Sequence, residues 1–300
     1  MLKVRIKDAA GCAFFYLIRG LERVLAPHRY YSLLQPLFGA RAMFNTILKK
    51  PGFAEPRPEF LQVTAAARVG RRQRTRDYLN HILEFFPERL GKEKWLDQCR
   101  FEGLERLHQA RQTGRPVILA FCHFGPYYLL RFWLRAAGIP AATLVRGRSV
   151  ERMRVMRLKD RLSPFPEIST AFYQDQLREL SEFIAAGNVL LVSIDAPAGR
   201  QMDLSFSEGW KLQMATGAMR LARRHQAELL SCAIIDEGSW HFCIRIGQPM
   251  PREFLVEESR APDDGWSGAG KYLLAELMPD LRTNPEQCRL DFIRRLAPDR

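Results

Sequence analysis

Residues 116–126 read Pro116-Val-Ile-Leu-Ala-Phe-Cys-His-Phe-Gly-Pro126. The apolar run at 117–121 has no polar interruption, which predicts a strand buried on both faces. A helix is predicted over 126–137, because proline is best tolerated in the first turn of a helix and Gly138-Ile-Pro140 then ends it. A buried strand, a short loop and a helix together make the first half of a βαβ unit.

The same alternation of apolar runs and amphipathic stretches continues to the end of the chain. The clearest further strand is Asn188-Val-Leu-Leu-Val-Ser-Ile194. Other predicted strands span 141–145, 228–235 and 240–246, and predicted helices span 149–162, 174–186, 214–224 and, with a break near Asn284-Pro285, 266–297. This alternation predicts an α/β fold with a mixed, mostly parallel sheet flanked by helices.

The first third of the chain has a different pattern. Residues 1–50 predict amphipathic helices interrupted near Pro27 and Pro36, and the Pro-rich stretch 51–58 predicts a loop. Apolar residues at helical spacing predict helices across 60–112. We therefore expect two parts: amphipathic, membrane-associating helices at 1–50 and an α/β domain at 51–300, in which 51–112 is a helical lead-in and 113–300 holds the core and C-terminal helices.

Charge is concentrated in the same region. The chain carries a net charge of +13, and residues 1–100 hold 19 Lys and Arg against 9 Asp and Glu, which is +10. An anionic partner is expected, either nucleic acid or lipid head groups. The apolar run at 9–18 is too short for a bilayer, which needs about 20 residues, and no signal-peptidase site follows it. Two interpretations stay open, a helix lying at a membrane interface and an ordinary packing helix.

Six cysteines stand at positions 12, 99, 122, 232, 243 and 288, without a C-x-x-C pair. This spacing predicts reduced, mostly buried thiols in a cytosolic setting, not a disulfide framework. Two histidines and two cysteines between 225 and 243 lack the spacing of a zinc site, so no metal is expected.

Polar side chains follow two of the predicted strands. His123 comes just after the strand at 116–121, and Asp195 just after the strand at 188–194. Ligands of open parallel sheets collect at the carboxyl ends of the strands, which makes both residues candidates for a site. The alternative for His123 is a capping residue or a hydrogen-bonded core residue.

The block His123-Phe-Gly-Pro-Tyr-Tyr128 resembles the His-Phe-Gly-Asn-Trp-Glu block of the bacterial lipid A lauroyl/myristoyl acyltransferases, a branch of the lysophospholipid acyltransferases. Later segments resemble further blocks of that family in the same order. They are Leu144-Val-Arg146, Ile194-Asp-Ala-Pro197, the stretch 209–222, which resembles the family's Gly/Thr-rich helix, and the tail 284–295. The resemblance thus covers nearly the whole chain.

The resemblance implies a glycerolipid acyltransferase-like fold and acyl transfer without a bound cofactor. The donor would be an acyl carrier protein or acyl-CoA, and the acceptor a hydroxyl or amine of a lipid or glycolipid. His123 would be the general base, while Arg146 and Arg148 would bind an anionic group of the acceptor or the donor's phosphopantetheine. The backbone at Gly125 would approach the substrate closely. Such an enzyme would be a peripheral or monotopic protein on the cytoplasmic face of the inner membrane.

One position departs from the family pattern. Tyr128 stands where the family has an acidic residue, and a phenol with a pKa near 10 is neutral at pH 7. In a serine-protease triad, loss of the equivalent charge lowers turnover about 10⁴-fold. Three outcomes stay open: Asp195 orients His123 in place of Tyr128, the acceptor is easier to deprotonate, or the protein is a non-catalytic membrane-bound scaffold or carrier-binding homologue.

Competing motifs carry less weight. The stretch 265–271 has the outline of a P-loop, but Tyr272 stands where Ser or Thr would bind magnesium, and no strand precedes it. The chain has no G-x-S-x-G motif of an α/β-hydrolase. The run Arg71-Arg-Gln-Arg-Thr-Arg76 lacks an accompanying nucleic-acid-binding signature, so lipid or an acidic carrier protein is expected there and nucleic acid is not.

Overall fold

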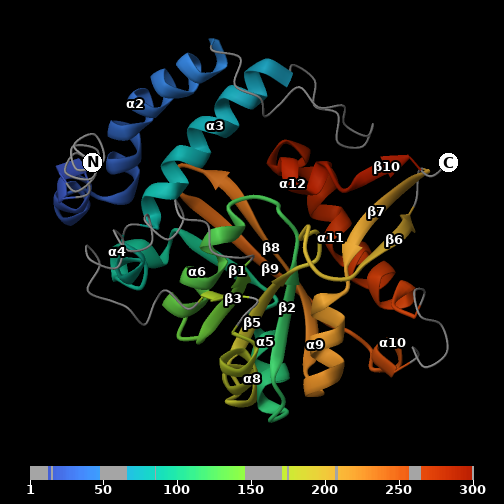
Figure 1. Cartoon of the computed structure of the whole chain (residues 1–300). Helices are drawn as coiled ribbons and strands as arrows, with labels where there is room; N and C mark the ends of the chain where they lie inside the picture. Colours follow the sequence, from blue (N-terminus) through green and yellow to red (C-terminus); the bar gives the residue numbers. More distant parts are fainter. Residues whose placement is uncertain are drawn as a thin grey trace, which may run out of the picture.

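The computed structural model describes residues 13–14, 16–47, 66–84, 86–145, 171–173, 176–206, 209–256 and 265–298 of the chain. Within these ranges seven strands form one sheet in the order β1-β9-β8-β2-β5-β3-β4 (Figure 1). The strands are β1 (Cys99–Glu102), β2 (Val117–Phe121), β3 (Ala141–Val145), β4 (Ala171–Tyr173), β5 (Val189–Ser193), β8 (Glu228–Gly238) and β9 (His241–Pro249). All neighbours are parallel except β8 and β9. The predicted mixed, mostly parallel sheet flanked by helices is confirmed.

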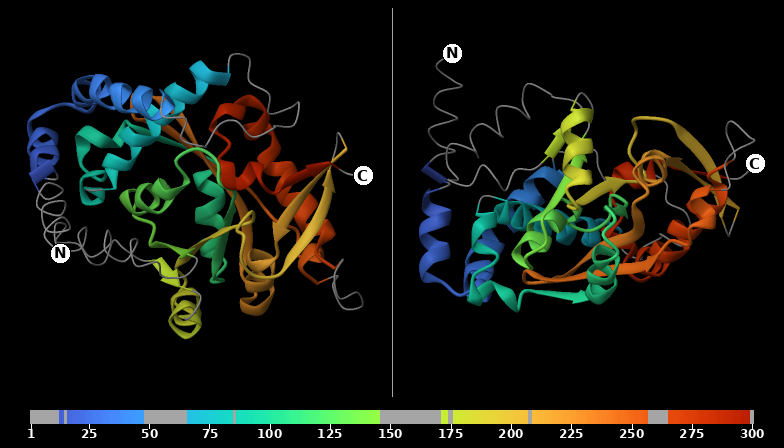
Figure 2. Two further views of the ribbon diagram at one scale, coloured as in Figure 1. Left: turned by 45° about the horizontal axis from the view of Figure 1, so that its top comes forward. Right: turned by 90° about the horizontal axis from the view of Figure 1, so that it is seen from below.

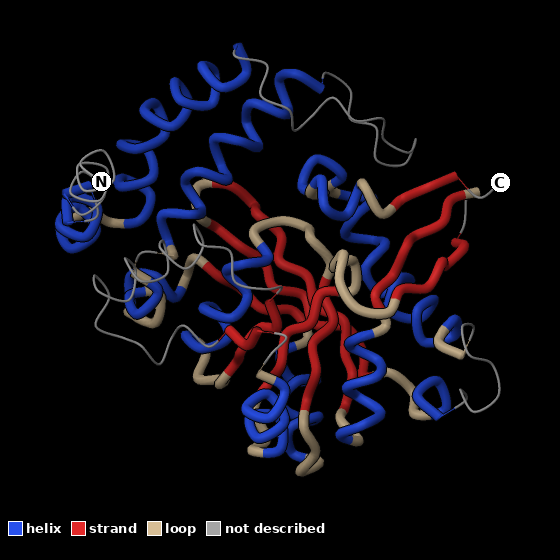
Figure 3. The backbone as a smooth tube through the Cα atoms, viewed as in Figure 1, coloured by secondary structure: helices blue, strands red, loops and turns tan. Residues whose placement is uncertain are grey.

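Both faces of the sheet are covered by helices, which explains the uninterrupted apolar sequence of β2 (Figure 3). Ile118 and Ala120 point into a core shared with α8 (Leu177–Ala185), α9 (Gly217–His225) and α11 (Ser267–Thr283). The alternate residues of β2 point into a second core, which includes side chains of α5 (Leu104–Gln112), the 3-10 turn η3 (Tyr127–Leu129) and α6 (Leu130–Ala136). The short remaining helices are η2 (Pro87–Arg89), α4 (Glu93–Leu96), α10 (Glu253–Val256), η5 (Pro285–Gln287) and α12 (Leu290–Ile293).

A second, antiparallel sheet of three described strands stands beside the first (Figure 2). Its strands are β6 (Gln201–Phe206), β7 (Trp210–Ala215) and β10 (Leu296–Pro298). Here the sequence prediction was wrong at two points. Residues 214 and 215 belong to β7, so the helix α9 starts only at Gly217, and residues 296–298 are a strand instead of the end of a helix. Leu212 and Met214 are buried while Gln213 is exposed, the period of two that a half-buried strand requires.

Two helices, α2 (Pro27–Ile47) and α3 (Ala66–Leu83), lie at one end of the main sheet (Figure 1). A further helical segment at residues 16–24 precedes them and contacts η2 and α4. The stretch 60–112, expected to be all helical, also contains the strand β1 at the sheet edge. The predicted helix at 149–162 lies outside the described residues.

The first helical segment is fixed to the body of the protein by a buried carboxylate. Glu22 accepts a hydrogen bond from Trp95 Nε1 (3.0 Å) and forms ion pairs with Arg89 (2.9 Å) and Lys94 (2.9 Å). Burial alone would raise the pKa of Glu22, but the hydrogen bonds and positive charges outweigh it and hold the pKa below its usual range. The N-terminal helices are therefore attached to the core by more than apolar contact.

Candidate functional site

His123 and Asp195 lie side by side at the carboxyl edge of the main sheet. The strands that precede them, β2 and β5, are parallel neighbours with Phe121 opposite Ser193. The pairing continues one step further, because the Ile194 N–H donates to the Phe121 carbonyl over 2.8 Å. The residues that follow these two strand ends therefore lie at one edge of the sheet. There His123 Nδ1 lies 2.8 Å from Asp195 Oδ1.

Asp195 is fully buried, and its carboxylate accepts several hydrogen bonds. It accepts the backbone N–H of His123 (2.9 Å to Oδ2), the hydroxyl of Ser193 (2.6 Å to Oδ1) and the ring N–H at Nδ1 of His123. Three hydrogen-bond donors thus converge on one buried carboxylate and fix its orientation. Donation from Nδ1 also sets the tautomer, because it leaves Nε2 with its lone pair.

The remaining nitrogen of His123 is available for chemistry. None of the described residues forms a hydrogen bond with Nε2, and the side chain is 14% exposed. Ser193 Oγ lies 3.3 Å from Nδ1, on the side of the ring that faces Asp195. Ser193 is therefore placed to support the carboxylate and not to be activated by Nε2 as a nucleophile.

The environment of His123 favours the protonated ring. Burial alone would lower the pKa of His123, but the hydrogen bond and negative charge of Asp195 outweigh it, so the pKa lies above its ordinary value of 6.5. The charge of Asp291 raises this pKa further, and that of Arg289 lowers it. Asp195 thus stabilises the cation that a general base becomes when it takes a proton.

Aromatic rings surround the imidazole. Tyr127 meets it edge-on with the ring centroids 4.5 Å apart, and Phe121 lies 6.4 Å away. Cys122, the residue before His123, is buried, and burial raises the pKa of its thiol well above the usual range. A thiol held in its neutral form is a poor nucleophile, so covalent catalysis by Cys122 is not supported.

Tyr128 does not contact His123. Its ring stacks on His81 of α3, and its hydroxyl is buried with no hydrogen-bond partner among the described residues. Burial raises the pKa of Tyr128 well above its usual value, so the phenol stays neutral. Of the two residues that the sequence offered as partners of His123, the structure brings only Asp195 to the ring.

Gly125 has a structural reason to lack a side chain. Its φ is +54°, and a Cβ atom there would lie 2.0 Å from the carbonyl oxygen of Ile234 on β8. The loop after β2 therefore passes directly over the neighbouring strand. Contact between Gly125 and a substrate stays a prediction, as it does for Arg146 and Arg148, which lie outside the described residues.

The described part of the chain holds no stronger alternative to this site. No group of three or more His, Cys, Asp or Glu side chains there has the arrangement of a metal site. A groove of about 820 Å³ runs between α11 and β6, lined by residues such as Leu274, Met278 and Arg282, but none of the candidate site residues lines it. Paired titratable groups at a strand edge can do acid–base chemistry and an open groove alone cannot, so the buried His123–Asp195 pair is the stronger candidate site.

Three residues that lie near His123 or Asp195 in the structure were not predicted from the sequence. Ser193 stands two positions before Asp195 on the same side of β5, so strand periodicity could have indicated it. Tyr127 and Arg289 gave no signal that separated them from neighbouring aromatic or basic residues.

The comparison with protein families agrees with the resemblance noted in the sequence. The family model for the bacterial lipid A biosynthesis acyltransferases matches residues 81–252, more than half of the chain. The chain belongs to this family. The match with the lipid A biosynthesis acyltransferases includes His123, Tyr128 and Asp195, and it ends before the tail that carries Arg289. No curated protein matches the chain significantly.

Among the helices that the structure describes, none is both long and apolar enough to pass through a bilayer.

Proposed function

We propose that this acyltransferase moves a fatty acyl chain from a thioester donor, an acyl carrier protein or acyl-CoA, to a hydroxyl or amine of a lipid-like or glycolipid acceptor. His123 is the general base. The single observation that carries this proposal is the 2.8 Å contact between His123 Nδ1 and the buried Asp195, which leaves Nε2 facing away from its partner.

The reaction needs no group beyond the two substrates and these side chains. Nε2 of His123 takes the proton of the acceptor while the acceptor oxygen or nitrogen bonds to the thioester carbonyl carbon. Asp195 stabilises the imidazolium during this step. The carbon–sulfur bond then breaks, the leaving sulfur takes the proton back from Nε2, and an ester or amide and a free thiol are released.

We also propose that the N-terminal helices rest on the cytoplasmic face of the inner membrane. α2 is apolar on two sides: Tyr30, Leu34 and Phe38 are buried, whereas Leu33, Leu37 and Phe44 are 53%, 58% and 61% exposed. At 100° per residue these three exposed side chains lie on one face of the helix. A contiguous exposed apolar face indicates a binding surface.

Positively charged side chains near this face indicate what binds to it. Arg29 and Arg41 are exposed on α2, and Arg23 is exposed on the preceding helix. Apolar side chains next to arginines suit a surface of anionic lipids. Glu22 and its partners fix these helices to the core. Binding of the helices to the membrane would therefore keep the His123 site at a fixed distance from the lipid surface.

The experiment that tests the function uses purified full-length protein with acyl-carrier-protein and acyl-CoA donors and lipids from a deletion strain as acceptors. We expect acyl transfer in the wild type, loss of transfer in His123→Ala, and little change in His108→Ala, an exposed histidine on α5. Mass spectrometry of the lipids identifies the product. A folded wild type that transfers no acyl group to any acceptor would support the non-catalytic scaffold, the alternative that the tyrosine at position 128 left open.

A further inference from the structure

A segment near the end of the chain runs antiparallel beside the loop that carries His123. Phe124 and Cys288 form an isolated bridge. On either side of this bridge, the Arg289 N–H donates to the His123 carbonyl over 2.9 Å, and the Gly125 N–H donates to the Gln287 carbonyl over 3.0 Å. The loop after β2 is therefore held as if it were paired with one more strand.

The side chain of Arg289 adds a second connection. Its Nε donates to the carbonyl oxygen of Gly125 over 2.9 Å, and its guanidinium forms an ion pair with Asp77 of α3. A guanidinium can serve both partners because its N–H groups lie in one rigid plane, whereas a lysine ammonium is a single point on a flexible chain. Arg289 thus ties the loop to a helix from the other end of the sequence.

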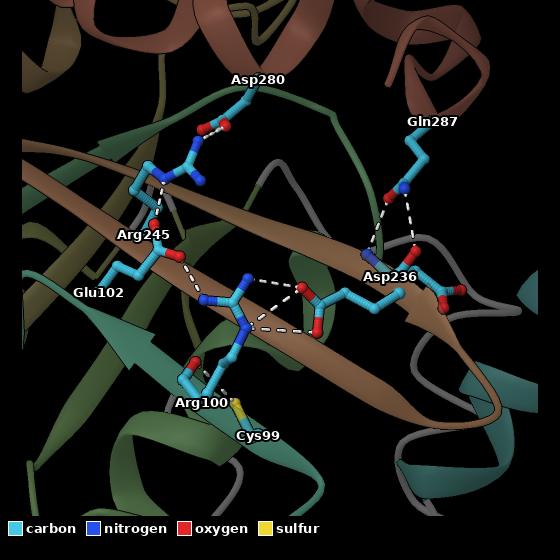
Figure 4. A network of polar contacts seen from close by, with 8 residues as sticks. Cys99, Arg100, Glu102, Asp236, Arg245, Asp280 and Gln287 are labelled. Carbon is cyan, nitrogen blue, oxygen red and sulfur yellow. Dashed lines mark hydrogen bonds and ion pairs between the residues drawn. The ribbon is translucent and has the colours of Figure 1, made fainter. Parts of the chain in front are cut away.

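The side chain of Gln287 fixes the same segment to β8. Its Oε1 accepts the Asp236 N–H over 2.9 Å and its Nε2 donates to the Asp236 carbonyl over 3.0 Å (Figure 4). The Asp236 carboxylate in turn accepts a hydrogen bond from Asn80 of α3 over 2.8 Å. Gln287 and Asp236 are both buried, so these bonds are shielded from competing water.

These contacts hold His123 at both of its backbone groups. Its N–H is bound by Asp195, and its carbonyl is bound by the N–H of Arg289. With the backbone fixed on both sides, the imidazole is held within hydrogen-bond distance of Asp195 before any substrate arrives. Displacement of a catalytic group by 1 Å can lower the rate by about 10²-fold.

We propose that Gln287 and Arg289 are positioning residues, which hold the His123 ring on Asp195 from the C-terminal end of the chain, and that Arg289 is the residue on which this position depends most. The effect on turnover rests on the proposed general-base role of His123. The position of the ring does not, and it is measured independently of activity.

The test is an NMR titration of histidine-labelled full-length protein, with the His123 signal assigned by its loss in His123→Gln. Arg289→Lys keeps the positive charge and removes the planar fork. We expect the pKa of His123 to fall toward 6.5 in this variant, because the contact with Asp195 is loosened. If Arg289 acted only through its charge, lysine would leave the pKa unchanged and Arg289→Gln would raise it, and the proposal would be overturned.

Two further variants separate positioning from stability. Asp77→Asn weakens the anchor of the guanidinium from the side of α3, and we expect a smaller fall of the His123 pKa in the same direction. Arg245 lies on β9, two strands away from β2, and forms a comparable ion pair with Asp280 of α11 (Figure 4). Arg245→Lys alters this ion pair. We expect this control to lower the melting temperature and leave the His123 pKa unchanged. An equal shift of the pKa in Arg245→Lys would overturn the proposal.

Turnover gives the last comparison. In Arg289→Lys we expect kcat to fall about 10- to 100-fold with a smaller change in KM, because a displaced base weakens the chemical step. If the wild type transfers no acyl group, the proposed function fails, while the titration still decides whether Arg289 positions the ring.

Discussion

The ring of Tyr128 stacks on the imidazole of His81, with the centroids 4.2 Å apart and the planes inclined by 6°. Position 128 therefore faces α3 and not the site. In the family pattern this position carries the acid that accompanies the histidine, and here a buried Asp195 from the end of β5 contacts His123 instead. Asp195, and not the residue at position 128, therefore supplies the carboxylate beside the imidazole.

Tyr128→Phe is expected to keep activity within about twofold and to leave the unfolding free energy unchanged or higher by about 1 kcal/mol. The phenylalanine keeps the ring stack, and it removes a buried hydroxyl that has no hydrogen-bond partner. Turnover and urea denaturation measure the two effects. A large loss of turnover in folded Tyr128→Phe would mean that the hydroxyl takes part in the reaction.

Asp195→Asn is expected to lower kcat by roughly 10²- to 10⁴-fold, since an amide cannot stabilise the imidazolium and can reverse the tautomer of His123. Ser193→Ala is the matched control, because it removes one neutral donor from the same carboxylate and keeps its charge. We expect a loss of at most about tenfold there. Steady-state kinetics on both variants make the comparison, and equal losses would contradict a special role for the charge.

The pH dependence of the reaction follows from the raised pKa of His123. A general base works in its neutral form, so kcat/KM is expected to rise with pH and to level off above the His123 pKa, with a midpoint higher than 6.5. Asp195→Asn should move this midpoint down, because it removes the main cause of the shift. A midpoint that stays in place would contradict the assignment.

The same shift predicts how stability changes with pH. A histidine whose pKa is higher in the folded than in the unfolded state stabilises the fold fully below the unfolded pKa, near 6.5, and loses this contribution as the pH rises through the folded value. The difference in unfolding free energy between the wild type and His123→Gln should therefore shrink from pH 6 to more alkaline pH. Denaturant titrations across this range measure it.

The sequence was sufficient for the parts of the fold that depend on local pattern. The uninterrupted apolar run of β2 predicted a buried strand and the run of β5 a second strand, and their parallel pairing brings His123 and Asp195 to one edge. β7 was missed because its alternation at 210–215 runs directly into a helical pattern, and the two periods overlap at Met214.

The contacts that complete the site could not be read from local pattern. Arg289 and Gly125 are 164 positions apart in the chain, and no periodicity connects them. The side chain of Tyr128 points toward His81, with which its ring stacks. His81 belongs to a helix that packs against the loop only in the folded protein. Such contacts are set by tertiary packing, which a single sequence does not specify.

The exposed face of α2 gives the last prediction. Leu33→Gln with Leu37→Gln is expected to weaken binding to vesicles containing phosphatidylglycerol by roughly tenfold per leucine, because burying such a side chain contributes about 1.5 to 3 kcal/mol. Gln35→Ala, at an exposed position of the same helix, is the control and should bind like the wild type. Cosedimentation measures binding, and high salt should weaken it through the arginines. If the wild type ignores the vesicles and elutes as a dimer that the leucine variant breaks, the face is a subunit contact and the membrane assignment is wrong.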